Sequence, residues 1–169
     1  GAGGGVGGAG GTVNGGPGSS GANGGTGSSG AAASDAIVFT GGTNVLQLQP
    51  GSTITGIVRN QAGSGTTLQL GGNTGTGTFD VSQISSSGQY RSFGPATLQK
   101  VGNSTWTLTG TNAGNLFWEL KGGTLAISAD NNFGSPGHNT SFDGGTLRFD
   151  TGFALSGAIG LQSGGGTID

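Results

Sequence analysis

The sequence lacks several residue types, and each absence excludes a class of chemistry. None of its 169 residues is cysteine or methionine. Without cysteine, disulfides, thiolate metal sites and cysteine nucleophiles are all excluded. Charged residues make up only 7% and the formal net charge is -2, so the sequence offers no basic patch of the kind that nucleic acids require. No apolar run approaches the roughly 18 residues that a membrane-spanning helix needs.

Glycine is abundant, with 43 residues, and it is concentrated at the start of the chain. Residues 1–35 contain no aliphatic side chain larger than valine, at Val6 and Val13. Such a segment has little apolar surface to offset the entropy cost of ordering glycine. We predict either a flexible linker here or glycine-rich rungs that continue the fold.

From residue 36 onward the sequence changes to short runs of alternating apolar and polar residues. Each run is bounded by glycine, asparagine, serine or proline, which is typical of strands joined by turns. The predicted strands cover 37–39, 44–49, 66–70, 78–82, 96–100, 105–109, 116–121, 124–128 and 146–150. No segment of ten or more residues shows the periodicity of a helix.

The sequence repeats a unit in which Gly-Gly-Thr precedes an alternating strand. The apolar anchors Leu125, Leu147 and Ile168 of three such units are separated by 22 and then 21 residues. Leu46 and Leu68 are likewise 22 residues apart. A fixed period in this range indicates a stack of similar units, because one unit cannot bury its apolar side alone.

This period predicts an all-β fold, a parallel β-helix (solenoid) over residues 36–169 preceded by the glycine-rich segment. About 22 residues at roughly 3.3 Å each can close a three-sided coil, and the chain has length for about six coils. Two wider steps, from Leu68 to Leu98 and from Leu98 to Leu125, are expected to be coils with longer loops.

Alternation along the strands separates inward from outward side chains. The residues expected to point inward are Leu46, Leu48, Leu68, Leu70, Phe79, Val81, Trp106, Leu108, Leu125, Ile127, Leu147 and Phe149. Phe117 and Trp118 are adjacent, so one of the two rings is expected to face outward. We identify Phe117 and Trp118 as the candidate surface contact, where an aromatic ring could serve as a platform for sugars.

No set of residues predicts a catalytic, cofactor-binding or metal site. A G-x-G-x-x-G pattern at Gly3 lacks the strand, helix and acidic residue of a nucleotide site. The Asp143 turn lacks the tandem glycine–aspartate repeats of calcium sites, so we expect a solvated corner residue. His138 lies in a turn-rich stretch and is expected to be an exposed loop histidine.

Paired carboxylates leave one enzymatic alternative open. Many β-helices degrade polysaccharides with two carboxyl groups about 5–9 Å apart. Asp143 and Asp150 lie at opposite ends of one predicted strand, roughly 20 Å apart, which is too far. Pairing of carboxylates across adjacent coils remains an alternative.

Several blocks of the sequence resemble the passenger domains of bacterial autotransporters. They also resemble the autotransporter-associated β-strand repeat, or passenger-associated transport repeat. The similarity covers residues 36–169, in blocks at 79–84, 89–90, 93–94, 100–110, 122–128, 131–134, 142–147 and 164–169. It implies a secreted or surface-exposed, right-handed β-helix from a Gram-negative bacterium, with an outer-membrane barrel C-terminal to this chain.

The resemblance implies a non-catalytic scaffold that supports secretion, folding and display, as part of an adhesin exported by type V secretion. The alternative is a binding module that contacts host-cell surfaces or glycans, and a polysaccharide-degrading β-helix is the least favoured hypothesis. We expect a monomer without cofactors. Unpaired strand edges at both ends of the stack could support self-association.

Overall fold

The computed structural model describes residues 33–94 and 97–169. The two alternatives for residues 1–35, a linker or glycine-rich rungs, concern residues that lie almost wholly outside the described part. Within the described residues every strand pairs with its neighbours in parallel, and the only helices are single 3-10 turns.

The strands form three parallel sheets. The three-stranded sheet consists of β1 (Asp35–Phe39), β3 (Ile57–Asn60) and β6 (Tyr90–Arg91). The six-stranded sheet consists of β2 (Asn44–Leu48), β4 (Thr66–Leu70), β7 (Thr97–Lys100), β9 (Phe117–Leu120), β11 (Asn139–Phe142) and β13 (Ala158–Leu161). The five-stranded sheet consists of β5 (Thr76–Asp80), β8 (Thr105–Thr109), β10 (Thr124–Ile127), β12 (Thr146–Phe149) and β14 (Thr167–Ile168).

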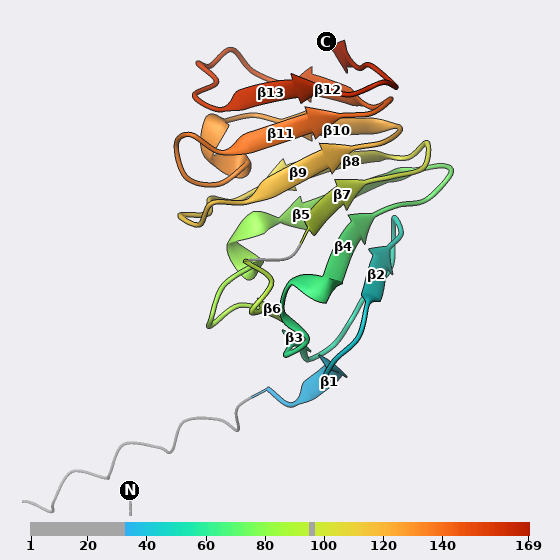
Figure 1. The fold of residues 1–169 in the computed structure, drawn as a ribbon, viewed down its shortest axis with the longest axis vertical. Helices are drawn as coiled ribbons and strands as arrows, with labels where there is room; N and C mark the ends of the chain where they lie inside the picture. The colour runs from blue at the N-terminus through green and yellow to red at the C-terminus, as the bar shows by residue number, and fades with distance from the viewer. Residues whose placement is uncertain (1–32, 95–96) are drawn as a thin grey trace, which may run out of the picture. The chain divides into compact units, whose positions relative to one another are not determined.

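The chain visits the sheets in turn and so winds into a parallel β-solenoid. One strand of the six-stranded sheet belongs to each coil, which gives about six coils and confirms the predicted fold class. In Figure 1 the strands β9, β11 and β13 cross the front of the view from left to right, and the chain returns behind while the stack rises, so the winding of these coils is right-handed. Among the described residues, the third side carries a strand only in the first coils, as β1, β3 and β6. In later coils it is formed by loops and the 3-10 turn η3 (Asp130–Asn132).

The predicted stacking of the leucine anchors is confirmed. Leu147 pairs with Leu125 on one side and with Ile168 on the other, in the five-stranded sheet. Leu46 pairs with Leu68 in the six-stranded sheet. Side chains 21 or 22 residues apart therefore lie directly over one another.

The predicted step from Leu98 to Leu125 is wrong, because the two residues belong to different sheets. Leu98 pairs with Trp118 in the six-stranded sheet, whereas Leu125 pairs with Trp106 in the five-stranded sheet. Each of these two sheets has its own series of stacked apolar residues, and both series contribute to the period of the sequence. Trp118 belongs to the series of the six-stranded sheet and Trp106 to that of the five-stranded sheet.

Four strands, β3, β6, β11 and β13, were not predicted. They are short and carry little alternation; β11, for example, has the sequence Asn-Thr-Ser-Phe. Their strand conformation follows from pairing with neighbours on adjacent coils, which intrinsic propensity does not reveal.

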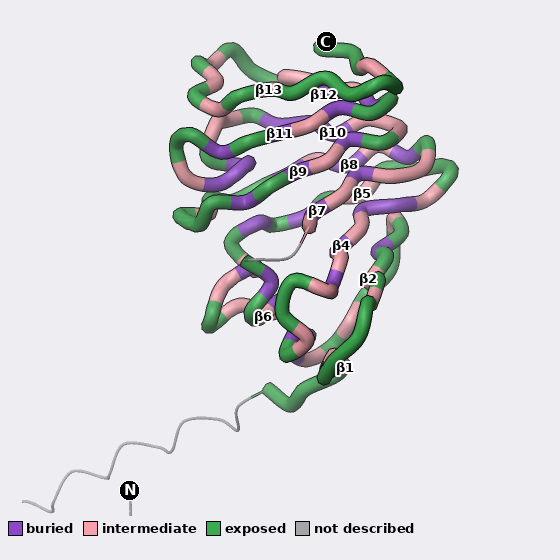
Figure 2. The backbone as a smooth tube through the Cα atoms, viewed as in Figure 1, coloured by how far each residue is buried: buried purple, intermediate pink, exposed green. Residues whose placement is uncertain are grey.

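The core is a file of apolar side chains enclosed by the sheets. Figure 2 shows buried and exposed positions alternating along the strands. Of the side chains expected to point inward, Leu46 and Phe149 are half-buried against the core and the others are buried, as predicted. Each fully buried leucine contributes roughly 1.5–3 kcal/mol. Trp106 satisfies its indole N–H by donating to the Gly71 carbonyl at 2.9 Å.

Apolar side chains also remain exposed on strands at the edges of the sheets. Leu161 on β13 is 67% exposed and Ile168 on β14 is 55% exposed. The predicted self-association through such edges stays a prediction. Among the described residues, no helix has the length and apolar character to cross a membrane.

Candidate functional site

A ladder of long polar side chains runs up the outer face of the six-stranded sheet. Gln47, Gln69, Gln99 and Glu119 occupy one outward column in register. Gln69 Nε2 donates to Gln99 Oε1 at 2.7 Å, and Gln99 Nε2 donates to Glu119 Oε2 at 2.7 Å. Lys121 Nζ lies 3.4 Å from Glu119 Oε2 at the end of the ladder. The hydrogen bonds therefore join three successive coils along this face.

The ladder stops where the next two coils place small residues in the same column. Ser141 pairs with Glu119, and Gly160 pairs with Ser141. Beside Ser141 lies a hollow of about 380 Å³, which is near the lower end of the size range of ligand sites. The hollow is lined by Phe117, Glu119, Lys121, Ser141, Asp143, Gln162 and Ser163.

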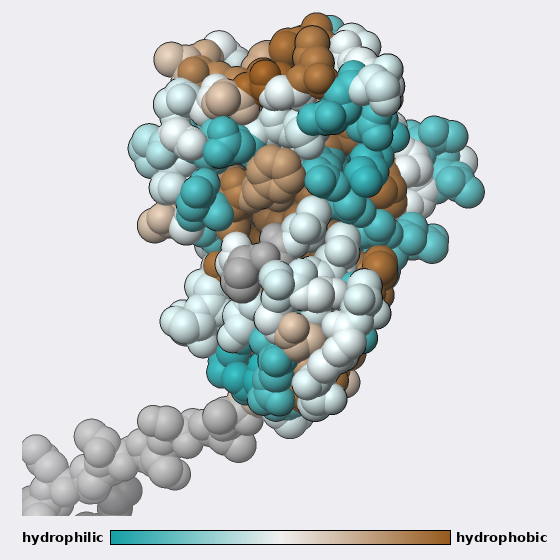
Figure 3. Space-filling view, viewed as in Figure 1, coloured by the Kyte–Doolittle hydropathy of each residue, from teal (hydrophilic) through white to brown (hydrophobic). Residues whose placement is uncertain are grey.

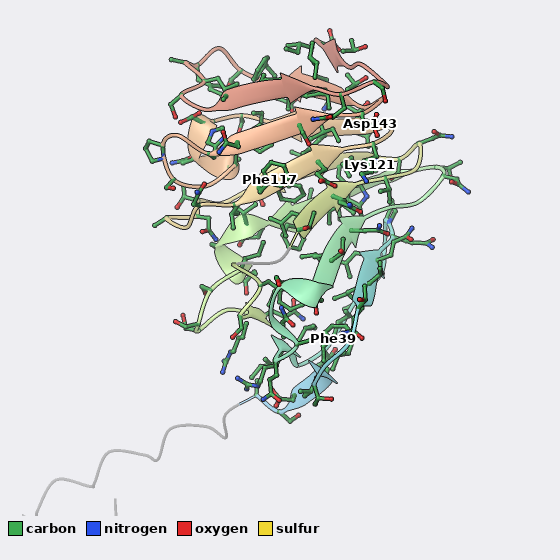
Figure 4. All side chains as sticks on the ribbon, viewed as in Figure 1. Phe39, Phe117, Lys121 and Asp143 are labelled. Atoms are coloured by element: carbon green, nitrogen blue, oxygen red, sulfur yellow. The ribbon has the colours of Figure 1, made fainter. Side chains whose placement is uncertain are left out.

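Phe117 is the aromatic side of this hollow. Its side chain is 41% exposed at the start of β9, and Figure 4 places it on the outer face of the sheet. In Figure 3 an apolar patch lies at this place, bordered by hydrophilic surface. The prediction that one of the two adjacent rings faces outward is confirmed. That Phe117 makes a contact stays a prediction.

The contact predicted for Trp118 is wrong. Trp118 is 0% exposed, because β9 alternation turns it inward, where it stacks between Leu98 and Thr140 of the neighbouring coils. It is one of the largest side chains of the core.

The polar groups of the hollow come from three strands. Glu119 lies on β9 and Lys121 directly follows it. Asp143 follows β11, and its Oδ1 accepts a hydrogen bond from Gly164 N at 2.9 Å. Gln162 follows β13 and completes the far side. Two carboxylates and one ammonium give the hollow a formal charge of -1. Across the described residues, no group of three or more His, Cys, Asp or Glu side chains could hold a metal ion.

His138 is buried rather than exposed, which corrects the expectation from the sequence. It is 1% exposed, its ring lies 5.2 Å from that of Phe133, and its Nε2 is 3.0 Å from Asp130 Oδ1. The loop between η3 and β11 folds back over the core and carries the imidazole with it. No pattern in the sequence distinguishes this loop from a solvated one.

Ser156 joins His138 and Asp130 in a cluster that is not a catalytic triad. Ser156 Oγ donates to Asp130 Oδ2 at 2.6 Å, and its backbone N–H donates to Asp130 Oδ1 at 2.9 Å. The carboxylate therefore lies between the hydroxyl and the imidazole, whereas catalysis needs the imidazole next to the hydroxyl. Burial acts to raise the pKa of Asp130, but hydrogen bonds from Ser156 and His138 lower it overall. The cluster links η3 to the next coil.

Lys100 is the one cation among the described residues that is fully enclosed. It occupies an inward position of β7 between Leu70 and Leu120 and is 0% exposed. Its Nζ donates to three backbone carbonyls, those of Val101 (2.8 Å), Gly122 (3.1 Å) and Gly102 (3.3 Å). The ammonium thus satisfies the carbonyl groups of two stacked turns.

The stability of the chain is expected to depend on the protonation of Lys100. Burial lowers the pKa of Lys100 from its ordinary value of 10.5 to about 8. Between these values the unfolded chain binds more protons than the folded chain, so raising the pH stabilises the fold. Relative to a Lys100→Met variant, the free energy of unfolding should therefore rise by about 2–3 kcal/mol from pH 8 to pH 10.5.

Urea unfolding of both proteins across this pH range measures the difference. The variant serves as the control because it retains the other groups that titrate, including Tyr90, whose pKa is raised by burial. A difference between the two proteins that stays constant with pH would contradict the expected desolvation of the ammonium.

The chain is similar to part of a known surface protein. It is 32% identical over 115 residues to the Adhesin BmaC autotransporter of Brucella suis biovar 1 (strain 1330), a match that covers 68% of this chain. The chain spans about 3% of the length of that relative. No family model matches the chain, and no solved structure matches it either. The similarity supports the resemblance to autotransporters, while the particular β-strand repeat stays a prediction.

Proposed function

We propose that this chain is a non-catalytic scaffold segment of a surface-exposed autotransporter passenger, where it supports secretion, folding and display of an adhesin. The observation that carries this proposal is the unbroken stack of parallel coils, in which each strand pairs in register with the coils beside it. The similarity to an autotransporter adhesin supports the same function.

The mechanism follows from the nearest-neighbour character of the stack. A coil buries its apolar side chains and pairs its strands only against the adjacent coil, so a folded coil is a template for the next one. Leu125, for instance, meets only Trp106 and Leu147 in its strand register. Segments that have reached the outside can fold while the rest of the chain is still crossing. Their folding then opposes backward movement of the chain.

The proposed location is the surface of a Gram-negative bacterium, or the surrounding medium after release. Anchoring would come from an outer-membrane barrel outside this chain. Sparse charge and the absence of cysteine are compatible with export, because no disulfide can lock the chain before it crosses.

Surface display of the full-length protein tests the proposal. Leu147→Asp places a carboxylate inside the stack, so display is expected to fall several-fold, because the coils around Leu147 can no longer template each other. Labelling of intact cells with an antibody against the passenger, at matched total expression, measures the amount displayed.

The matched control is Val45→Asp, which places the same carboxylate at an apolar residue that is 57% exposed on the outer face of β2. Display of this variant should remain close to that of the wild type. If Leu147→Asp reached the surface as fast and as fully as Val45→Asp, the proposed role of coil folding in export would be refuted.

The exposed ring of Phe117 beside a polar hollow favours a second candidate function, an adhesin module that contacts a host-cell surface or glycans. A polysaccharide-degrading enzyme has less support. Asp130 is held by His138 and Ser156, and Asp150 pairs with Arg148 at 2.7 Å, so these carboxylates already have partners within the fold.

A further inference from the structure

We propose that the hollow beside Phe117 is a binding site for a neutral saccharide. The inference deepens the adhesin alternative by naming a site and a ligand class. It does not depend on the scaffold function, since it rests only on the outer face of the six-stranded sheet.

The ring of Phe117 supplies the surface on which a pyranose could stack. Most outward positions of its column hold small or polar residues, with Thr67 and Thr97 on the preceding coils and Asn139 on the next. An exposed phenylalanine therefore departs from the local pattern, and it does so beside the hollow. The negative face of an aromatic ring attracts the weakly positive C–H bonds that a pyranose presents on its apolar side.

The polar rim supplies partners for sugar hydroxyl groups. Glu119 and Asp143 accept hydrogen bonds, Lys121 donates them, and the amide of Gln162 can do both. These groups reach the hollow from three successive coils, and Figure 4 shows Lys121 and Asp143 on the same outer face as Phe117. One aromatic face beside several polar groups offers the two kinds of contact that a pyranose can make, stacking and hydrogen bonds to its hydroxyl groups.

The charge of the rim favours neutral over acidic sugars. Glu119 and Asp143 contribute two negative charges, and Lys121 contributes one positive charge that is already 3.4 Å from Glu119. A sugar carboxylate would meet net repulsion and would lack a free cation to pair with. A hydroxyl group has no such penalty, because it can donate to either carboxylate.

The polar ladder ends beside the hollow, and a variant that lengthens the ladder is expected to fill part of the hollow. A Cβ atom added at Gly160 would meet no atom nearer than the Thr140 carbonyl oxygen, at 4.0 Å. The side chain of Gly160→Gln would therefore begin in open space, in the column of Gln69, Gln99 and Glu119 and next to Ser141, which lines the hollow. Phe117→Thr removes the ring and introduces a threonine, the residue type that occupies this column on β4 and β7, as Thr67 and Thr97.

The experiment is a titration of the isotope-labelled 169-residue chain with methyl β-galactopyranoside and with methyl β-glucopyranoside, followed by amide chemical shifts. For so shallow a site we expect a Kd on the order of 1–10 mM for at least one probe, with the shifts confined to the residues around Phe117. Phe117→Thr should weaken binding at least about fivefold, and Gly160→Gln should do the same.

Val45→Thr is the matched control, because Val45 lies in the Phe117 column at the other end of the sheet and is 57% exposed. It should bind like the wild type. N-Acetylneuraminic acid, the acidic probe, should bind at least about tenfold more weakly than the best neutral probe.

Absence of shifts at about 50 mM of either neutral probe would overturn the proposal, as would binding that survives both Phe117→Thr and Gly160→Gln. Equal binding of the acidic probe would overturn the assignment to neutral sugars. None of these outcomes bears on surface display, so the saccharide site and the scaffold function can fail separately.

Discussion

Leu125→Asp is expected to destroy the fold of the coils that surround it. Leu125 is 0% exposed and stacks between Trp106 and Leu147, so an aspartate there has neither solvent nor a polar partner. Loss of the leucine contacts and burial of an unpaired carboxyl group together cost more than about 5 kcal/mol. This is comparable with the total stability of a typical domain, roughly 5–15 kcal/mol.

The damage should spread to both neighbours, because every coil depends on the coils beside it. Far-ultraviolet circular dichroism and limited proteolysis of the 169-residue chain measure the result. We expect loss of most of the strand signal and rapid cleavage in the region of β8 to β12. Leu161→Asp, which changes an exposed leucine, should resemble the wild type in both measurements. A folded, protease-resistant Leu125→Asp chain would show that the stacked column of Trp106, Leu125 and Leu147 is not needed to hold the coils together.

The sequence alone could predict the stacking because a solenoid repeats its packing at a fixed chain length. Each coil must bring a large apolar side chain to the same place, so Leu125 and Leu147 reveal their pairing through their spacing. The same logic explains the error at Leu98. Both of the larger sheets contribute a stacked apolar residue to every coil. Counting from Leu98 in one sheet to Leu125 in the other therefore still gives a spacing close to the length of one coil.

Alternation could also have revealed the burial of Lys100, since it lies two residues after the inward Leu98 on the same strand. Burial of an ammonium group requires partners, however, and here these are carbonyl oxygens of turns on two different coils. Their convergence depends on how the coils stack. No local pattern contains that information.

The candidate site was only partly predictable for the same reason. Adjacency and alternation indicate that either Phe117 or Trp118 faces outward, but the choice depends on which residue pairs with the core column. The polar ladder ends because Ser141 and then Gly160 follow Glu119 in the same column, on strands β11 and β13 that sequence alternation does not reveal. Burial of His138 depends on the path of a loop whose sequence is typical of solvated turns.

Gly123→Ala is expected to open the corner at which the six-stranded sheet turns into the five-stranded sheet. Gly123 has φ of 61°, a conformation that costs other residues roughly 1–2 kcal/mol. Its neighbours add to this cost, because a Cβ atom would lie 2.5 Å from the carbonyl oxygens of Gly102 and Ser104 and 2.6 Å from Lys100 Nζ. The backbone cannot simply shift, since the Gly123 carbonyl accepts a hydrogen bond from Thr146 N at 2.8 Å.

Gly165→Ala separates the cost of the positive φ from the cost of the close contacts around the added Cβ atom. Gly165 lies in the same kind of corner on the last coil with φ of 65°, but a Cβ atom there would meet nothing within 4 Å. Gly165→Ala should therefore lower the free energy of unfolding only by the roughly 1–2 kcal/mol that positive φ costs a non-glycine residue. Gly123→Ala should lower it by about 3 kcal/mol or more. Thermal unfolding should show a Tm for Gly123→Ala that is lower than that of Gly165→Ala by about 4 °C or more. Equal Tm values would mean that positive φ alone selects glycine at these corners, and that the close approach of successive turns does not.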